Sequence, residues 1–298
     1  MAWLVLTALC WAPLSLARAA AAALARIAMA LTPGWRRIAD RNLDLALPEL
    51  TPDQRGKVVR GAYQNLGRVV LALARLPRLT SANISQWIDY EGFEHYQQAI
   101  ARGRGVIFLT AHLGNWELSS AAHALFGNPM HVMVRPLDNP YLDRLVERRR
   151  SLFGNRTIRK QHAAREVLRA LRANQPVGIL ADQNAAGDDG VFVDFFGRAA
   201  SATVGVAQFA ARSGAAVIPG FAFWNDRSKR YVLKFYAPLD LSDSGDRKTD
   251  ALENTARFQA AIERAVREHP EQWLWIHRRW KRRPPGEPDL YESRGKVY

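Results

Sequence analysis

The pattern of apolar and polar positions divides the chain into an apolar N-terminus and a longer region of mixed periodicity. Residues 1–17 carry no charged side chain, and apolar residues continue to Leu31 with two arginines between them. A Thr-Pro-Gly sequence at 32–34 then breaks the helical pattern. Across 36–79, apolar positions recur at helical spacing and are interrupted by three prolines, which predicts two or three helices.

The apolar N-terminus predicts a membrane anchor helix over residues 1–31. Seventeen uncharged residues are near the lower limit for a spanning helix, and the Ala-rich continuation supplies more length if Arg18 and Arg26 reach toward the headgroups. The two arginines lie roughly 80° apart around a helix, so a helix lying in the membrane plane is an alternative.

A cleaved signal peptide is a further alternative, because Ala17-Arg18-Ala19 resembles a small-residue cleavage site. The chain lacks a basic start, however, and its positive charges follow the apolar run. That order favours a retained anchor in the inner membrane, with the globular part on the cytoplasmic face.

Short apolar strands alternate with helical patterns in the rest of the chain. Strands are expected at 106–109, 130–134, 177–180, 216–223 and 231–235, and helices at 115–125, 141–153, 163–173, 204–212 and 251–268. The segment 221–235 has the pattern of a hairpin. These elements predict an α/β fold with a mixed sheet flanked by helices, in which 35–298 form one catalytic domain.

The charge of the chain favours anionic partners. Lys and Arg outnumber Asp and Glu by 42 to 28, which gives a net charge of +14 and a pI near 10.5. A phospholipid surface, an acidic carrier protein and nucleic acid all fit this charge, but no nucleic-acid reader motif accompanies it. Cys10 is the single cysteine, which excludes an internal disulfide. The histidines form no zinc-ligand pattern; those considered are His95, His123, His131 and His162.

The segment Thr110 to Glu117 carries the strongest chemical signal. His112 follows the strand at 106–109, and functional groups gather at the carboxyl ends of strands in open α/β sheets. If His112 lies in the turn and Glu117 on the first turns of the next helix, Glu117 can hold one imidazole nitrogen and leave the other to take a proton from a hydroxyl. The alternative is a helix-entry histidine beside a solvated glutamate.

Three other polar residues are candidates for the same site. Arg135 ends the strand at 130–134 and is expected at the same sheet edge, where it can stabilise an oxyanion or bind an anionic group; the alternative is a surface arginine beside a proline turn. Asp182 follows another strand and can hold Arg135, position an acceptor or form a structural turn. Asn115 can contact the reaction centre or cap the following helix.

Residues 277–283 are the densest positive patch, with five Lys or Arg around Trp280. The patch predicts docking to an acidic carrier protein or to lipid phosphates, with Trp273, Trp275 and Trp280 near an interface. A solvated basic tail is the alternative.

Several blocks of the sequence resemble one family. HLGNWE at 112–117 resembles the acyltransferase motif of a histidine, four residues and an acidic residue, and its form is similar to the lipid A biosynthesis acyltransferases, the late lauroyl and myristoyl transferases of the glycerolipid acyltransferase superfamily. The further blocks follow in the family's order: VRPLDNP at 134–140, ADQ at 181–183, GVFVDFFG at 190–197 and WIHRRWKRRP at 275–284. Asp194 is a departure, because family members usually carry proline there.

The resemblance implies transfer of a fatty acyl chain from an acyl carrier protein thioester to a hydroxyl of an anionic lipid A precursor, as a step of lipopolysaccharide biosynthesis at the membrane. It implies His112 and Glu117 as the catalytic pair, and Arg135, Asp182 and Asn115 as substrate-binding or oxyanion residues. Neither a metal nor an organic cofactor is implied. The alternatives are a related acyltransferase acting on a lysophospholipid or aminolipid, and a non-catalytic membrane protein that binds anionic lipid.

Overall fold

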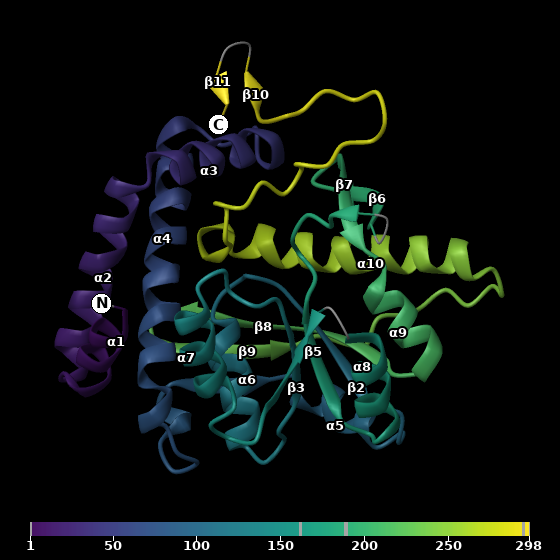
Figure 1. Ribbon diagram of the computed structural model, residues 1–298, viewed down its shortest axis with the longest axis horizontal. Helices are drawn as coiled ribbons and strands as arrows, with labels where there is room; N and C mark the ends of the chain where they lie inside the picture. Colours follow the sequence, from purple (N-terminus) through teal and green to yellow (C-terminus); the bar gives the residue numbers. More distant parts are fainter. Residues whose placement is uncertain (1, 161–162, 188–189, 294–295, 298) are drawn as a thin grey trace.

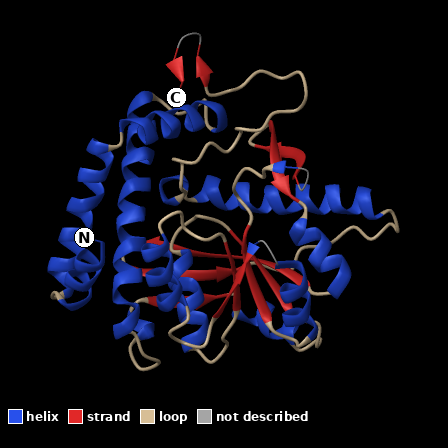
Figure 2. Ribbon diagram, in the orientation of Figure 1, coloured by secondary structure: helices blue, strands red, loops and turns tan. Residues whose placement is uncertain are grey.

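A mixed seven-stranded sheet forms the centre of the computed structural model, which describes residues 2–160, 163–187, 190–293 and 296–297 (Figure 2). From edge to edge the strands are β1 (Ile88–Glu91), β9 (Arg230–Phe235), β8 (Ala216–Asn225), β2 (Val106–Thr110), β5 (Pro176–Leu180), β3 (His131–Val134) and β4 (Arg156–Arg159). The pair β8 and β9 is antiparallel, as the predicted hairpin requires, and the other neighbours are parallel. The predicted mixed sheet is therefore confirmed.

Helices cover both faces of this sheet (Figure 1). They are α3 (Pro33–Ala46), α4 (Pro52–Arg75), α5 (Phe93–Ile100), α6 (Trp116–Leu125), α7 (Pro140–Arg150), α8 (Ala163–Arg172), α9 (Gly205–Ser213) and α10 (Arg247–Glu268). Because strand side chains alternate between faces, Val106 and Phe108 of β2 pack in the core with α5 and α6. Ile107 and Leu109 pack in the opposite core, with α8, α9 and α10.

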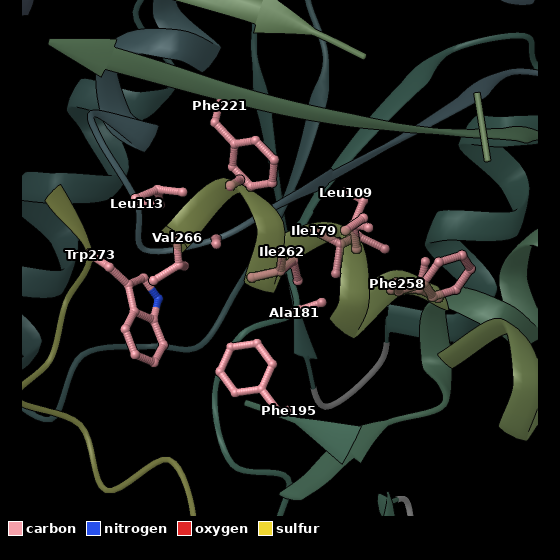
Figure 3. Packing of buried hydrophobic residues seen from close by; sticks show 14 of the residues in the cluster. Leu109, Leu113, Ile179, Ala181, Phe195, Phe221, Phe258, Ile262, Val266 and Trp273 are labelled. Carbon is pink, nitrogen blue, oxygen red and sulfur yellow. The ribbon is translucent and has the colours of Figure 1, made fainter. Parts of the chain in front are cut away.

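The long helix α10 packs across one face of the sheet (Figure 3). Phe258, Ile262 and Val266 are each four residues apart, so they form one apolar stripe. All three are at most 1% exposed and belong to the same core as Leu109 of β2 and Ile179 of β5. The core contacts of Leu109 and Ile179 therefore support β2 and β5 close to their carboxyl ends.

The apolar N-terminus folds into two helices, α1 (Ala2–Trp11) and α2 (Leu14–Leu31), where the sequence predicted one. The break falls at Pro13, which lacks the backbone N–H that a continuous helix needs. The helix α2 lies along α4, and Gly67 of α4 lets the two approach closely, because a side chain there would collide with the carbonyl of Ala21. By length and composition α2 is able to cross a membrane.

Most elements predicted from the apolar pattern are present, and the elements missed are short or polar. The edge strand β4 is Arg-Thr-Ile-Arg with one buried residue of four, so it carries almost no apolar signal. The antiparallel ribbon of β6 (Gly190–Phe195) and β7 (Arg198–Thr203) lies outside the main sheet and contacts α10. Further short elements are η1 (Leu76–Arg78), η2 (Ile84–Gln86), η5 (Pro270–Gln272), β10 (Glu292–Ser293) and β11 (Lys296–Val297).

Candidate active site

The carboxyl ends of β2 and β5 bring His112 and Asp182 together. The two strands are parallel neighbours with Thr110 opposite Leu180, and each candidate side chain lies two residues beyond that pair. The N–H of Ala181 donates to the carbonyl of Thr110 at 3.0 Å and extends the pairing by one step. The strand register thereby places Nδ1 of His112 2.9 Å from Oδ1 of Asp182.

Asp182 is a buried carboxylate that accepts three hydrogen bonds. They come from Nδ1 of His112, from the backbone N–H of His112 at 2.9 Å and from Nε1 of Trp273 at 2.8 Å. Burial alone raises the pKa of Asp182, but the neighbouring imidazole and these N–H groups outweigh it and lower the pKa to about 2. Because an ionised carboxylate only accepts hydrogen bonds, Nδ1 donates to it, and in the neutral ring the lone pair then lies on Nε2.

Glu117 does not hold the His112 ring, and the prediction that it fixes the imidazole tautomer is wrong. The glutamate lies on the first turn of α6, as expected, but it accepts two hydrogen bonds from Arg150 of α7, at 2.9 Å from Nε and 2.5 Å from Nη2. Glu117 and Arg150 are 7% and 18% exposed, so this is a largely buried ion pair. The orienting position beside Nδ1 belongs to Asp182.

A cleft of about 640 Å³ opens beside the His112 ring. Its charged lining residues are His112, Glu117, Arg135, Asp138, Arg150 and Lys160, and its apolar lining includes Trp116, Val132, Leu137 and Leu180. A second, apolar cavity shares Trp116 and Leu180 with the cleft and continues between α6 and the sheet toward Phe108 and Met130. The site thus combines a histidine, several cations and an adjoining apolar space.

Arg135 pairs with Asp138 and not with Asp182, which overturns the alternative in which Asp182 holds Arg135. Arg135 is at the outer rim of the cleft, 80% exposed and 3.2 Å from Asp138. Among the residues that the structure describes, no three His, Cys, Asp or Glu side chains are grouped to hold a metal ion. His162, one of the histidines considered above, lies outside the described residues.

Asn115 and Gly114 shape the turn between His112 and α6. Asn115 is fully buried and its side chain accepts from the N–H of Leu118 at 3.0 Å, which is the capping role weighed for it above. Gly114 has a φ of +63°, and an added Cβ would collide with the carbonyl oxygen of Ala222. Glycine is required here because both the backbone conformation and the close approach exclude a side chain.

The middle of the basic segment 277–283 is buried, so the prediction that it forms a docking patch is wrong for Arg279 and Trp280, while Lys281 is exposed and the other members are half-buried. Trp273, Trp275, Arg279 and Trp280 are at most 2% exposed. Arg279 donates to Gln259 and to the carbonyl of Ser201 instead of reaching a partner.

Residues 273–277 hold both loops of the site in place through hydrogen bonds. Leu274 N–H donates to the carbonyl of His112 at 3.0 Å, and Trp273 donates to Asp182. His277 accepts the backbone N–H of Asn184 at Nε2, at 3.0 Å, and burial lowers the pKa of His277 to about 4, so this ring is neutral. The loop after β2 and the loop after β5 are therefore both anchored by one stretch of chain.

Sequence reasoning could have found the role of Asp182 from one signal. His112 and Asp182 both follow predicted strands, and parallel strand ends meet at one sheet edge. Trp273 could not be found in this way, because it is 91 residues from Asp182 and follows a helix.

Comparison with known proteins places this geometry in context. The family model described as "Bacterial lipid A biosynthesis acyltransferase" matches residues 1–282. A lipid A biosynthesis acyltransferase of Haemophilus influenzae is 28% identical over 259 residues, 86% of this chain and 79% of the relative. A lipid A biosynthesis lauroyltransferase of Escherichia coli is 27% identical over 90% of this chain and 86% of its own length. A lipid A biosynthesis myristoyltransferase of Escherichia coli is 26% identical over 92% and 83%.

Proposed function

Since the chain belongs to the bacterial lipid A biosynthesis acyltransferase family, we propose that it transfers a fatty acyl group from an acyl carrier protein thioester to a hydroxyl of a lipid A precursor, with His112 as the general base. The observation that carries the proposal is the pairing of His112 with Asp182 at the edge of the cleft. The acceptor implied by the family resemblance is a hydroxyacyl chain of a Kdo-bearing tetraacyl disaccharide.

His112 supplies the proton transfer in this mechanism. Nε2 removes the proton of the acceptor hydroxyl while the oxygen attacks the thioester carbonyl carbon, which forms a tetrahedral oxyanion. Asp182 stays ionised, keeps the ring in the productive tautomer and stabilises the imidazolium. Collapse of the intermediate breaks the carbon–sulfur bond, and the imidazolium returns the proton to the leaving thiolate.

Cations and N–H groups near His112 are suited to the oxyanion. The helix α6 begins four residues after His112, and the N–H groups of Trp116 and Glu117 have no acceptor within this helix, while that of Leu118 is taken by the Asn115 cap. Arg135 at the rim and Arg150 at the wall are each paired with a carboxylate, and Lys160 adds a positive charge that forms no salt bridge with a described residue. We assign Glu117 the task of fixing Arg150, because its two hydrogen bonds define the direction of that guanidinium.

The donor and the acceptor approach from different directions in this proposal. Lys160 lines the cleft and follows Arg159 at the carboxyl end of β4; both side chains are exposed and suit an acidic carrier protein. The lipid acceptor arrives from the inner membrane. The apolar outer faces of α1 and α2 attach the chain to the cytoplasmic side of that membrane.

The experiment is acyl transfer from labelled acyl carrier protein thioesters to the lipid A precursor in detergent micelles. We expect product with the wild type and a loss of at least a thousandfold in kcat with His112→Gln, while His131→Gln, a half-buried histidine that does not line the cleft, acts as a matched control with unchanged kcat. No product from a folded wild-type protein would discard this acceptor, and a panel of lysophospholipids and aminolipids would then identify the substrate.

A further inference from the structure

A second cleft, of about 270 Å³, lies between α2, α4 and the β8–β9 hairpin. It shares no lining residue with the cleft beside His112, so it is a separate site. The floor is apolar, with Ala21, Ala22 and Leu71. With Trp87 of the segment before β1, four segments far apart in the sequence meet here, so the cleft exists only in the folded chain.

Three cations converge on this cleft from three of these segments. Arg18 comes from α2, Arg68 from α4 and Lys229 from the turn between β8 and β9. One carboxylate lies beside them, Asp226, which is 76% exposed and lies 3.8 Å from Arg68 and 3.3 Å from Lys229. Arg18 contacts the carbonyl of Lys229 at 3.4 Å and forms no salt bridge with a described residue. Three positive charges against one negative charge leave an excess of two.

Aromatic rings line the cleft beside these cations. The guanidinium of Arg68 lies 4.8 Å from the centre of the Trp224 ring, and Trp224 packs against Tyr231 at 5.1 Å. Trp87 completes the wall. Tryptophan and tyrosine beside arginine and lysine are typical of side chains at the boundary between a bilayer and water.

The position of the cleft on α2 matches the depth of lipid headgroups. The exposed apolar residues Leu16 and Ile27 lie roughly 160–180° around the helix from Arg18. A helix is about 10 Å wide, and a helix in the membrane plane sinks its apolar face about 5–10 Å into the boundary of headgroups and acyl chains, so Arg18 on the opposite side lies within roughly 5 Å of that boundary. The headgroup layer extends roughly 5–8 Å beyond the hydrocarbon on each side of a bilayer, and phosphate groups lie in this layer.

We propose that this cleft binds the phosphate-bearing headgroup of an anionic phospholipid and thereby sets the orientation of the chain on the membrane. The cations hold the phosphate, the aromatic wall holds the glycerol region, and Leu71 with the two alanines meets the start of the acyl chains. The proposal rests on the membrane attachment proposed above and is independent of the acyl-transfer chemistry.

The test measures binding of single lipid molecules to the full chain in detergent micelles by native mass spectrometry. Phosphatidylglycerol and phosphatidylcholine are titrated against the wild type, against Arg18→Ala/Lys229→Ala and against Arg26→Ala/Arg37→Ala. The last variant removes two exposed charges from α2 and α3 without touching the cleft, which makes it the matched control. Thermal unfolding of each variant checks folding, and Lys229→Glu alone serves as a second cleft variant.

We expect one saturable phosphatidylglycerol site in the wild type. The affinity of this site should be at least tenfold lower in the cleft variants and within twofold of the wild-type value in the control. Equal losses in the cleft and control variants, or equal affinity for phosphatidylcholine, would overturn the site. Displacement of the lipid by glycerol phosphate at the same concentration would overturn the assignment to a lipid and identify a soluble phosphate ligand. The assay contains no acyl donor, so its failure is distinct from failure of the proposed acyl transfer.

Discussion

Replacing Asp182 with asparagine tests which carboxylate orients the catalytic histidine. The change keeps the shape of the side chain but turns one acceptor oxygen into a donor NH₂ group. Three N–H groups point at the two oxygens of Asp182, so at least one of them then faces another donor. If the amide oxygen serves the backbone and Trp273, the amide nitrogen faces Nδ1 of His112 and favours the opposite tautomer, which leaves Nε2 without its lone pair.

The expected magnitude follows from the burial and pKa of this carboxylate. Lowering the pKa from 3.8 to about 2 corresponds to about 2 kcal/mol of preferential stabilisation of the ionised form. Because the folded-state pKa is the lower one, this contribution is present above pH 3.8 and is lost as the pH falls toward 2. An unsatisfied buried donor costs about 1–3 kcal/mol of unfolding free energy. For the reaction, a wrong histidine tautomer lowers kcat on the order of 10³-fold or more, as when the aspartate of a serine protease triad is replaced.

The assay compares kcat for acyl transfer in wild type, Asp182→Asn and the exposed control Asp243→Asn, together with urea unfolding of each protein. We expect the control to match the wild type in both measurements. A folded Asp182→Asn protein whose kcat is within tenfold of wild type would refute the orienting role. In that case Glu117 would again be the leading partner to test.

Three further changes probe the surroundings of the site. Glu117→Gln leaves the charge of Arg150 buried without its partner, so we expect urea unfolding to show a loss of about 3–5 kcal/mol, and a loss below 1 kcal/mol would contradict a buried ion pair. Gly114→Ala forces a side chain into the carbonyl of Ala222, so we expect a loss of more than about 3 kcal/mol, measured by thermal unfolding, and a stable variant would show that the turn can rearrange. The pKa of His277 is about 4 in the folded chain and 6.5 in the unfolded chain, so the free energy of unfolding should decrease by up to about 3 kcal/mol as the pH drops from 6.5 to 4. The variant His277→Gln should flatten this pH dependence. An unchanged slope in the variant would contradict a neutral His277 ring.

The sequence by itself determined the elements of the central domain and the general place of the chemistry. Strands and helices with strong apolar periodicity, such as 106–109 and 251–268, were predicted because burial on one face or both leaves a repeating pattern in the chain. The position of His112 after a strand indicated the sheet edge, and the order of the HLGNWE and later blocks indicated the family. The polar edge strand β4 was missed because a strand with one buried residue leaves no such pattern.

Only the tertiary structure decided which side chains act together. Sequence proximity favoured Glu117 as the partner of His112, but the parallel register of β2 and β5 places Asp182 there, 70 residues away along the chain. The density of arginines near Trp280 indicated an exposed patch, whereas the structure buries Trp280 and Arg279 behind the site, because their hydrogen-bond partners come from distant segments. Local sequence sets the periodicity of each element, but contacts between elements depend on register and packing, which local patterns do not contain.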